Sequence, residues 1–250
     1  QQRQQYLPFD PMLIAAGATL GGSVGAGLSG PGRFRYGGLR DFVLGVKFLS
    51  GDGEVINSGG KVVKNAAGFD IPKLLTGSMG RLGVMVEMTF KVFPMPGCNQ
   101  TLAVACDSLE TAMQRMSVAA SSAWELDAID YRPATQSLFL RLAGPEKVNQ
   151  ILVKKINDLW GADVTELSNG AAVWQSVTEL EWSQEFRPLA VKVPAHRSVM
   201  GPLVDLADQR AGVDLHFSAA GAVAWLLCES QDDVDQLDRV LLENEVAGLV

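Results

Sequence analysis

Residues 17–30, which read GATLGGSVGAGLSG, hold six glycines in fourteen positions and no acidic, basic or aromatic side chain. Glycine has no Cβ, so a segment this poor in side chains lets the backbone approach another group closely. This segment constrains the fold more than any other, because the rest of the chain must bring a partner group to that bare backbone.

Three interpretations of this segment are open. A solvated linker has no use for the apolar side chains of Leu20, Val24 and Leu28. A dinucleotide-binding fingerprint is matched by Gly25-Ala-Gly27-Leu-Ser-Gly30, but no strand precedes it, and Pro31-Gly32 follow where its helix should run. We favour a third interpretation, a loop whose backbone N–H groups approach a phosphate and a flat ring together.

A second glycine-rich segment lies at Gly77–Gly83 and leads directly into a strand. In that strand, Gly83–Phe93, alternate residues predict one apolar face formed by Val84, Val86, Met88, Phe90 and Val92. An earlier hairpin is predicted from the apolar run 42–49, the turn at Asp52-Gly53 and the run 54–56.

The totals favour two domains and exclude several function classes. The 250 residues carry 21 Lys plus Arg against 28 Asp plus Glu, a net charge of −7, and the absence of a basic block argues against nucleic-acid binding. Cys98, Cys106 and Cys228 are widely spaced, so we expect reduced thiols in a cytoplasmic protein. No apolar stretch of membrane-spanning length occurs, and we expect any membrane association to come through a partner.

From residue 99 onward the pattern changes to capped helices alternating with strands. Capping-box spacing at Asp107–Glu110 predicts a helix, strands follow at 126–131 and 137–142, and a second helix runs from Glu146 to Gly161. That helix is expected to carry one apolar face, made of Val148, Ile151, Leu152, Ile156, Leu159 and Trp160.

The same order of elements then recurs. Strands are predicted at 189–193, 216–217 and 222–228, with one helix around 199–207 and another capped by Ser230. Leu102-Ala-Val104 and Leu189-Ala-Val191 begin the two units, 87 residues apart. We therefore predict an α+β cap of two ferredoxin-like β-α-β-β-α units.

The order of motifs over the first hundred residues resembles the flavin domain of the vanillyl-alcohol oxidase type, the PCMH-type FAD-binding superfamily. The motifs are Ala18-Thr-Leu-Gly-Gly22, Arg40-Asp41 with Val43-Leu-Gly45, Gly51-Asp-Gly53, Lys64-Asn-Ala-Ala-Gly-Phe-Asp70, Gly77-Ser78 with Gly80 and Leu82-Gly-Val84, and Glu87. Within that superfamily the 64–70 block and the Gly77-Ser-Met-Gly80 segment are most similar to the FAD-binding accessory subunits of bacterial glycolate oxidases.

The resemblance implies FAD as the cofactor, a partial PCMH-type domain over residues 1–98, and a cap or substrate-type domain over 99–250. It places at the pyrophosphate and flavin edge Thr19, Leu20, Gly21, Gly22, Ser23 and Gly25, with Ser29 and Gly30 continuing that wall. It places Gly80, Leu82, Gly83 and Val84 on the adenosine and ribityl side. Compared with complete family members the chain is expected to be truncated at both ends.

Oxidising a 2-hydroxy acid needs a base for the hydroxyl proton and an acceptor for hydride. Catalytic relatives of this family carry a His-x-Gly-Asp-Gly-Asn-x-His metal motif, and aligning the chain by Gly221 puts Phe217 and Ala224 at the two histidine positions. We therefore expect no metal site. His216 is the remaining candidate base, and the alternative that we favour is a structural histidine at a strand edge or against a partner.

These observations lead to one leading hypothesis and two alternatives. The leading hypothesis is an FAD-binding subunit of a glycolate oxidase or dehydrogenase complex, which oxidises glycolate to glyoxylate. The chain would support flavin electron transfer beside a catalytic FAD subunit and an iron–sulfur subunit. The alternatives are a non-catalytic assembly module that has lost FAD, and a stand-alone FAD-dependent D-2-hydroxyacid dehydrogenase using His216 as its base.

Overall fold

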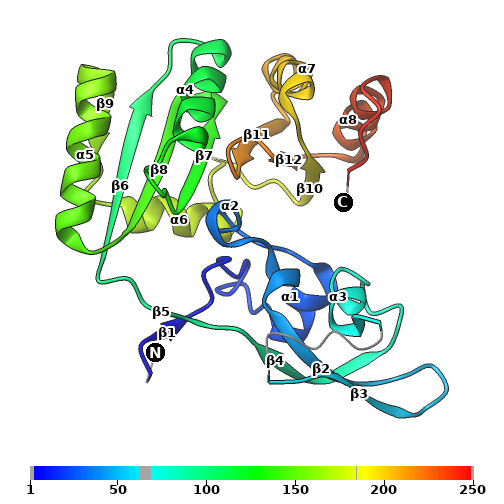
Figure 1. The fold of residues 1–250 in the computed structure, drawn as a ribbon. Helices are drawn as coiled ribbons and strands as arrows, with labels where there is room; N and C mark the ends of the chain where they lie inside the picture. Colours follow the sequence, from blue (N-terminus) through cyan, green and yellow to red (C-terminus); the bar gives the residue numbers. More distant parts are fainter. Residues whose placement is uncertain (1–2, 62–68, 184, 249–250) are drawn as a thin grey trace. The chain divides into compact units, whose positions relative to one another are not determined.

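The computed structural model describes residues 3–61, 69–183 and 185–248, and the chain divides into two compact units, Gln1–Met95 and Pro96–Val250. In the first unit an antiparallel sheet of order β3-β2-β4 is joined by a two-stranded ribbon of β1 and β5 (Figure 1). The elements are β1 (Gln5–Tyr6), α1 (Leu20–Ala26), α2 (Arg33–Tyr36), the 3-10 turn η1 (Leu39–Asp41), β2 (Val43–Leu49), β3 (Val55–Gly59), α3 (Ile71–Leu75), β4 (Val84–Phe90) and β5 (Phe93–Pro94).

The predicted hairpin is confirmed as β2 and β3. The Ser50 N–H donates to the Glu54 carbonyl at 2.9 Å, and Gly53 takes the positive φ, +81°, that the turn requires. The core of this unit gathers buried side chains of several elements around Phe42, including Phe9, Val24, Val46 and Leu75. Because Val24 is fully buried there, this core fixes α1 against the sheet.

The predicted apolar face of the long strand is wrong in part. Val84 and Val86 are 63% and 61% exposed, whereas Met85, Met88 and Phe90 pack against the core. The register between β2 and β4 shifts between Lys47 and Phe48. Lys47 pairs with Glu87, but the next residue of β2, Phe48, pairs with Met85, so Val86 has no partner on β2. Such a bulge inverts the alternation of side chains, which a strict period of two does not anticipate.

The second unit contains two successive β-α-β-β-α units, as predicted. The first is β6 (Cys98–Ala105), α4 (Leu109–Ser121), β7 (Ala128–Arg132), β8 (Ser137–Gly144) and α5 (Glu146–Trp160), with the 3-10 turn η2 (Pro133–Thr135) between β7 and β8. The second is β10 (Leu189–Pro194), α7 (Arg197–Gln209), β11 (Val213–Ser218), β12 (Val223–Cys228) and α8 (Gln231–Glu243). Between them lie the 3-10 turn η3 (Gly161–Asp163), β9 (Val164–Glu166) and α6 (Gly170–Thr178).

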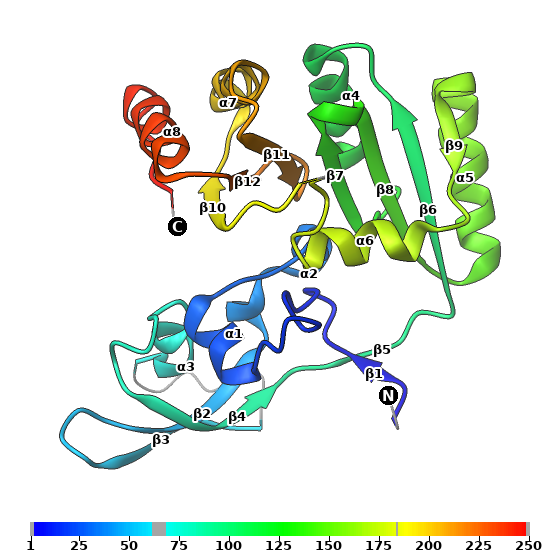
Figure 2. The ribbon, with the colours of Figure 1, turned by 180° about the vertical axis from the view of Figure 1, so that it is seen from behind.

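The seven strands that the structure describes in the second unit form one antiparallel sheet of order β10-β12-β11-β7-β8-β6-β9. The order β7-β8-β6-β9 is that of a ferredoxin-like fold, and β11-β12-β10 mirrors its first three strands. Helices α4 and α5 lie beside the first set of strands and α7 and α8 beside the second (Figures 1 and 2). The two sets join where Phe217 of β11 pairs with Tyr131 of β7.

Two helix predictions need correction. Helix α4 is capped by Ser108, whose Oγ accepts from the Thr111 N–H at 3.1 Å, so the helix begins one residue later than the Asp107–Glu110 spacing implies. In α5 the predicted apolar face is divided, because Ile156 is buried while Val148, Ile151 and Leu159 are 48–57% exposed. Helical spacing identified an apolar stripe but not which side of the helix meets the sheet.

Candidate functional site

The first glycine-rich segment forms a short helix and not the loop that we expected. Thr19 is the N-cap of α1, and its Oγ1 accepts from the Gly22 N–H at 3.0 Å. Gly27 ends the helix in the left-handed conformation, φ +65°, and its N–H donates to the Ser23 carbonyl at 2.9 Å. Gly25 and Gly27 therefore lie at the C-terminal end of a helix, which excludes the dinucleotide fingerprint, whose glycines precede one.

The structure brings the two glycine-rich segments together. The Gly77 N–H donates to the Val24 carbonyl at 2.9 Å, and the Met79 N–H donates to the Gly25 carbonyl at 2.8 Å. A Cβ on Gly27 would lie 3.1 Å from the Gly77 Cα, tighter than ordinary contacts allow. The end of α1 and the segment before β4 thus meet backbone to backbone, and glycine is required for this approach.

The residues expected at the cofactor fall into two groups. Thr19, Leu20 and Gly22 on α1 and Gly80, Leu82 and Val84 on the second segment are exposed, while Gly21, Ser23 and Gly83 are partly exposed and Gly25 is buried. Ser29 and Gly30 differ because both are buried and anchor the chain internally. The Ser29 Oγ accepts from the Leu39 N–H at 2.8 Å, and the Gly30 N–H donates to the Phe9 and Asp10 carbonyls, both at 2.9 Å.

Aliphatic side chains stand exposed around the bare backbone. Leu20 is 52% exposed, Leu82 45% and Met79 51%. Met79 also adopts a positive φ of +54°, which is uncommon for a residue with a side chain. These exposed apolar side chains lie on two segments that contact each other, and they are available to a ligand.

Most of the 64–70 block, Lys64 and Asn65 included, lies outside the described residues. Its last residue, Asp70, caps α3 and accepts from the Lys73 N–H at 3.2 Å.

His216 lies inside the second unit with no exposed surface, and its Nε2 is 2.8 Å from Oδ2 of Asp130 on β7. Asp130 also accepts from the Ser218 hydroxyl at 2.9 Å and from the Ala219 N–H at 3.2 Å. Burial lowers the pKa of His216, and the nearby Asp130 carboxylate opposes that shift. A general base must reach its substrate, so this geometry fits the structural alternative for His216.

Sequence reasoning missed Asp130, the partner of His216. The available signal was an acidic residue inside a predicted apolar strand, because such a residue is buried only when it is hydrogen-bonded.

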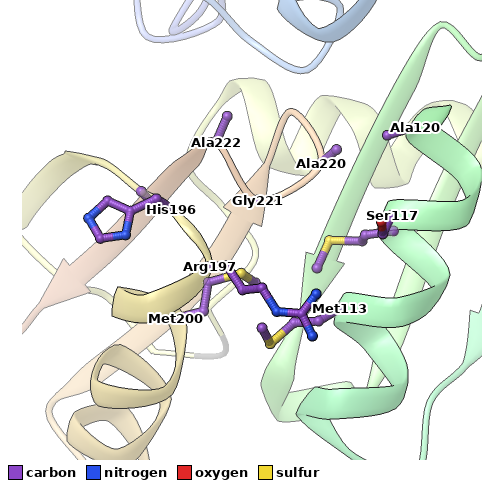
Figure 3. A pocket seen from close by; sticks show the side chains of 11 residues that line it. Met113, Ser117, Ala120, His196, Arg197, Met200, Ala220, Gly221 and Ala222 are labelled. Carbon is purple, nitrogen blue, oxygen red and sulfur yellow. The ribbon is translucent and has the colours of Figure 1, made fainter.

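The turn that aligns with the metal motif of catalytic relatives lines a cavity of about 330 Å³ (Figure 3). Ala220, Gly221 and Ala222 form one wall, and Met113, Met116 and Met200 come from α4 and α7. Arg197 extends from α7 toward Met113 in the same view.

The two positions aligned with the metal histidines face each other in the sheet. Phe217 pairs in register with Ala224, both are fully buried, and the Phe217 ring stacks on Tyr131 with centroids 6.5 Å apart. No group of three or more His, Cys, Asp or Glu side chains is placed to hold a metal ion within the part of the chain that the structure describes. None of the helices in those residues is long and apolar enough to cross a bilayer.

A family model and several known proteins are similar to this chain. A family model described as an FAD binding domain matches residues 1–59. The glycolate oxidase subunit GlcE of Escherichia coli is 31% identical over 242 residues, covering 94% of this chain and 62% of that protein. The D-lactate dehydrogenase of Archaeoglobus fulgidus is 36% identical over 107 residues, covering 43% of this chain and 24% of that protein.

Among solved structures, an alkyldihydroxyacetonephosphate synthase superposes with a TM-score of 0.71 at 14% identity, covering 98% of this chain and 56% of that one. That likeness concerns the fold alone. The chain thus spans less than two thirds of the length of these relatives. The family model therefore indicates an FAD binding domain in residues 1–59, and over most of its length the chain is similar to a glycolate oxidase subunit.

Proposed function

We propose that the chain is the FAD-binding subunit of a complex that oxidises glycolate to glyoxylate, working beside a separate catalytic FAD subunit and an iron–sulfur subunit. The observation that carries the proposal is the backbone contact between the two glycine-rich segments, Val24–Gly25 with Gly77–Met79. The similarity to a glycolate oxidase subunit over most of the chain supports the choice of complex.

The residues of the first unit fit FAD by shape and chemistry. Gly21 and Gly22 leave the backbone of α1 bare, with no Cβ in the way of the pyrophosphate. Because the Gly22 N–H is bonded to the Thr19 Oγ1, the N–H groups of Leu20 and Gly21 before it would hold the pyrophosphate. The exposed side chains of Leu20, Leu82 and Val84 would contact the apolar ring and sugar faces. When bound, FAD supplies the two-electron acceptor that oxidation of a hydroxy acid requires.

The second unit supports a division of labour between subunits. His216 is closed off from solvent and bonded to Asp130, so it is not placed to accept a proton from a substrate. We infer that the hydroxy acid is oxidised on the catalytic subunit, and that this chain contributes its flavin and its binding surface to the assembly.

The test is coexpression of the complete protein with its catalytic and iron–sulfur partners. We expect a complex in which this chain retains FAD, seen as flavin absorbance after partial dissociation, and glycolate-dependent reduction of an acceptor only when all partners are present. Bleaching of the flavin by glycolate in this chain alone would instead show a stand-alone dehydrogenase. Full activity of a complex whose copy of this chain holds no flavin would show an assembly module.

A further inference from the structure

The second unit contains a guanidinium group with two nitrogens that make no hydrogen bond to the described residues. Arg132 ends β7 with its side chain partly buried, and its Cζ lies 5.5 Å from the centroid of the Phe139 ring. Its Nε and Nη2 atoms are both buried and make no hydrogen bond to any residue that the structure describes. A buried donor without a partner carries its full desolvation cost, so such atoms call for an explanation.

Other arginines of the same unit show the usual solution. Arg141 donates to Asp127 at 2.5 Å, Arg187 to Asp214 at 3.0 Å, and Arg210 to Asp233 at 2.7 Å. Arg132 is an exception among these, although it remains charged at any ordinary pH.

The nearest acidic side chain on its own strand cannot serve as that partner. Asp130 already accepts hydrogen bonds from His216, Ser218 and the Ala219 N–H. The pairing of Phe217 with Tyr131 puts His216 opposite Arg132 on the same face of the sheet, so the histidine takes the carboxylate and leaves the arginine without one.

The unpaired atoms of Arg132 form one edge of the guanidinium. Nε–H and an Nη2–H point the same way, and this fork matches the two oxygens of a carboxylate. Trp182 adds a third unpaired donor, because its Nε1 is buried without a partner among the described residues and its side chain is only 8% exposed. Its ring lies against His216, with centroids 5.1 Å apart.

Arg132 and Trp182 line a common cavity of about 360 Å³, which also touches Thr135 and Leu215. Its acidic lining residues, Asp214 and Glu185, are both paired with Arg187, so neither of them bonds to Arg132. The volume lies at the low end of the range for ligand pockets and is ample for a small molecule. The unpaired nitrogens are themselves buried, so binding requires the Arg132 and Trp182 side chains to rotate toward the cavity.

We propose that this cavity binds a small monocarboxylate, with its two oxygens on Nε and Nη2 of Arg132 and a further hydrogen bond from the Trp182 indole. No residue of the first unit takes part, so the inference stands apart from the proposed FAD site. Either proposal can therefore fail while the other survives.

The test titrates the 250-residue chain with sodium glycolate at constant ionic strength and without added FAD, followed by calorimetry and tryptophan fluorescence. We expect saturable binding and a fluorescence change. Arg132→Lys keeps the charge but loses the fork, and we expect about tenfold weaker binding. Trp182→Phe keeps a ring over His216 but removes the N–H, and we expect about threefold to tenfold weaker binding.

The matched control is Arg239→Lys, on the exposed side of α8, which should bind glycolate like the wild type. Thermal unfolding checks that each variant is folded, and Trp182→Phe keeps the proposal testable if Arg132→Lys does not fold. The proposal is overturned if the wild type shows no saturable binding, or if both variants bind as tightly as it does. Tighter binding of inorganic phosphate than of glycolate would also overturn it, because a general anion site would then explain the data.

Discussion

The sharpest test of the FAD site is the addition of one methyl group to α1, in Gly22→Ala. Gly22 is exposed in the first turn of the helix, and a Cβ there would meet only the Thr19 Oγ1, at 3.2 Å. Alanine is a better helix former than glycine by about 0.8–1 kcal/mol, which offsets the small adjustment that Thr19 must make. We therefore expect the stability of the free chain to change by less than about 1 kcal/mol.

FAD binding should respond differently to the same methyl. If the backbone of Gly22 contacts the pyrophosphate directly, the methyl holds the ligand off and lengthens the hydrogen bonds from the α1 amides. Losing one such contact corresponds to at least about 1.4 kcal/mol, a tenfold loss of affinity. The assay is a titration of the cofactor-free chain with FAD, followed by quenching of flavin fluorescence, and urea unfolding of the same samples.

The control is Gly51→Ala in the β2–β3 turn of the same unit. A Cβ there meets no atom within 4 Å, and its φ lies in the ordinary range, so this variant makes the same chemical change away from the site. We expect wild-type FAD affinity from it. Equal FAD affinity for Gly22→Ala, Gly51→Ala and the wild type, within about twofold, would refute the placement of FAD on α1.

Three further predictions follow from single contacts. Gly27→Ala should lower the free energy of unfolding by about 2 kcal/mol or more, because it combines a positive φ with a Cβ 3.1 Å from the Gly77 Cα; unchanged urea unfolding would contradict this. Thr19→Ala should lower the free energy of unfolding by about 1 kcal/mol, because it removes the N-cap of α1. Thr19→Ser keeps a hydroxyl at the cap and should unfold like the wild type in the same assay. Burial depresses the pKa of His216 in the folded chain below its ordinary value of 6.5. As the pH falls, the unfolded chain therefore takes up a proton on this histidine at a higher pH than the folded chain does. The free energy of unfolding of the wild type should then decrease as the pH falls below 6.5, and His216→Gln should make this decrease smaller. Equal slopes of unfolding free energy against pH in the two proteins would contradict the prediction.

The sequence predicted best where the determinants are local. The hairpin at Asp52-Gly53 and the two β-α-β-β-α units depend on turn residues, caps and periodicity within short windows, and the hairpin and both units appear in the structure. The Ser230 capping box is present as predicted, with the Ser230 Oγ and the Asp233 carboxylate each bonded to the other's backbone N–H. Such signals need no knowledge of the rest of the chain.

The same reasoning failed where distant residues decide the outcome. Residues 20–26 have poor helix propensity, yet they form a helix because Val24 is buried in the core and the amides of Gly77 and Met79 bond to its last carbonyls. At the bulge beside Val86, the register with β2 decides which side chains face the core. The partner of α1, the 77–79 segment, and the partner of β4, strand β2, cannot be identified from the residues next to either element.

The polar cluster of the second unit shows why its side chains could not be assigned from sequence. Each β-α-β-β-α unit would leave its second strand, β7 or β11, as an unpaired edge, and the structure joins these two edges into one sheet. Their register is recorded by one pair, Tyr131 with Phe217, and a shift by one residue would turn every side chain to the opposite face. Asp130 and His216 are 86 residues apart, and the hydrogen bond between them forms only in the observed register. The buried pair therefore favours this register of β7 and β11 over registers shifted by one residue. The structural interpretation of His216, which the sequence analysis favoured, is thus explained by the joining of two repeats.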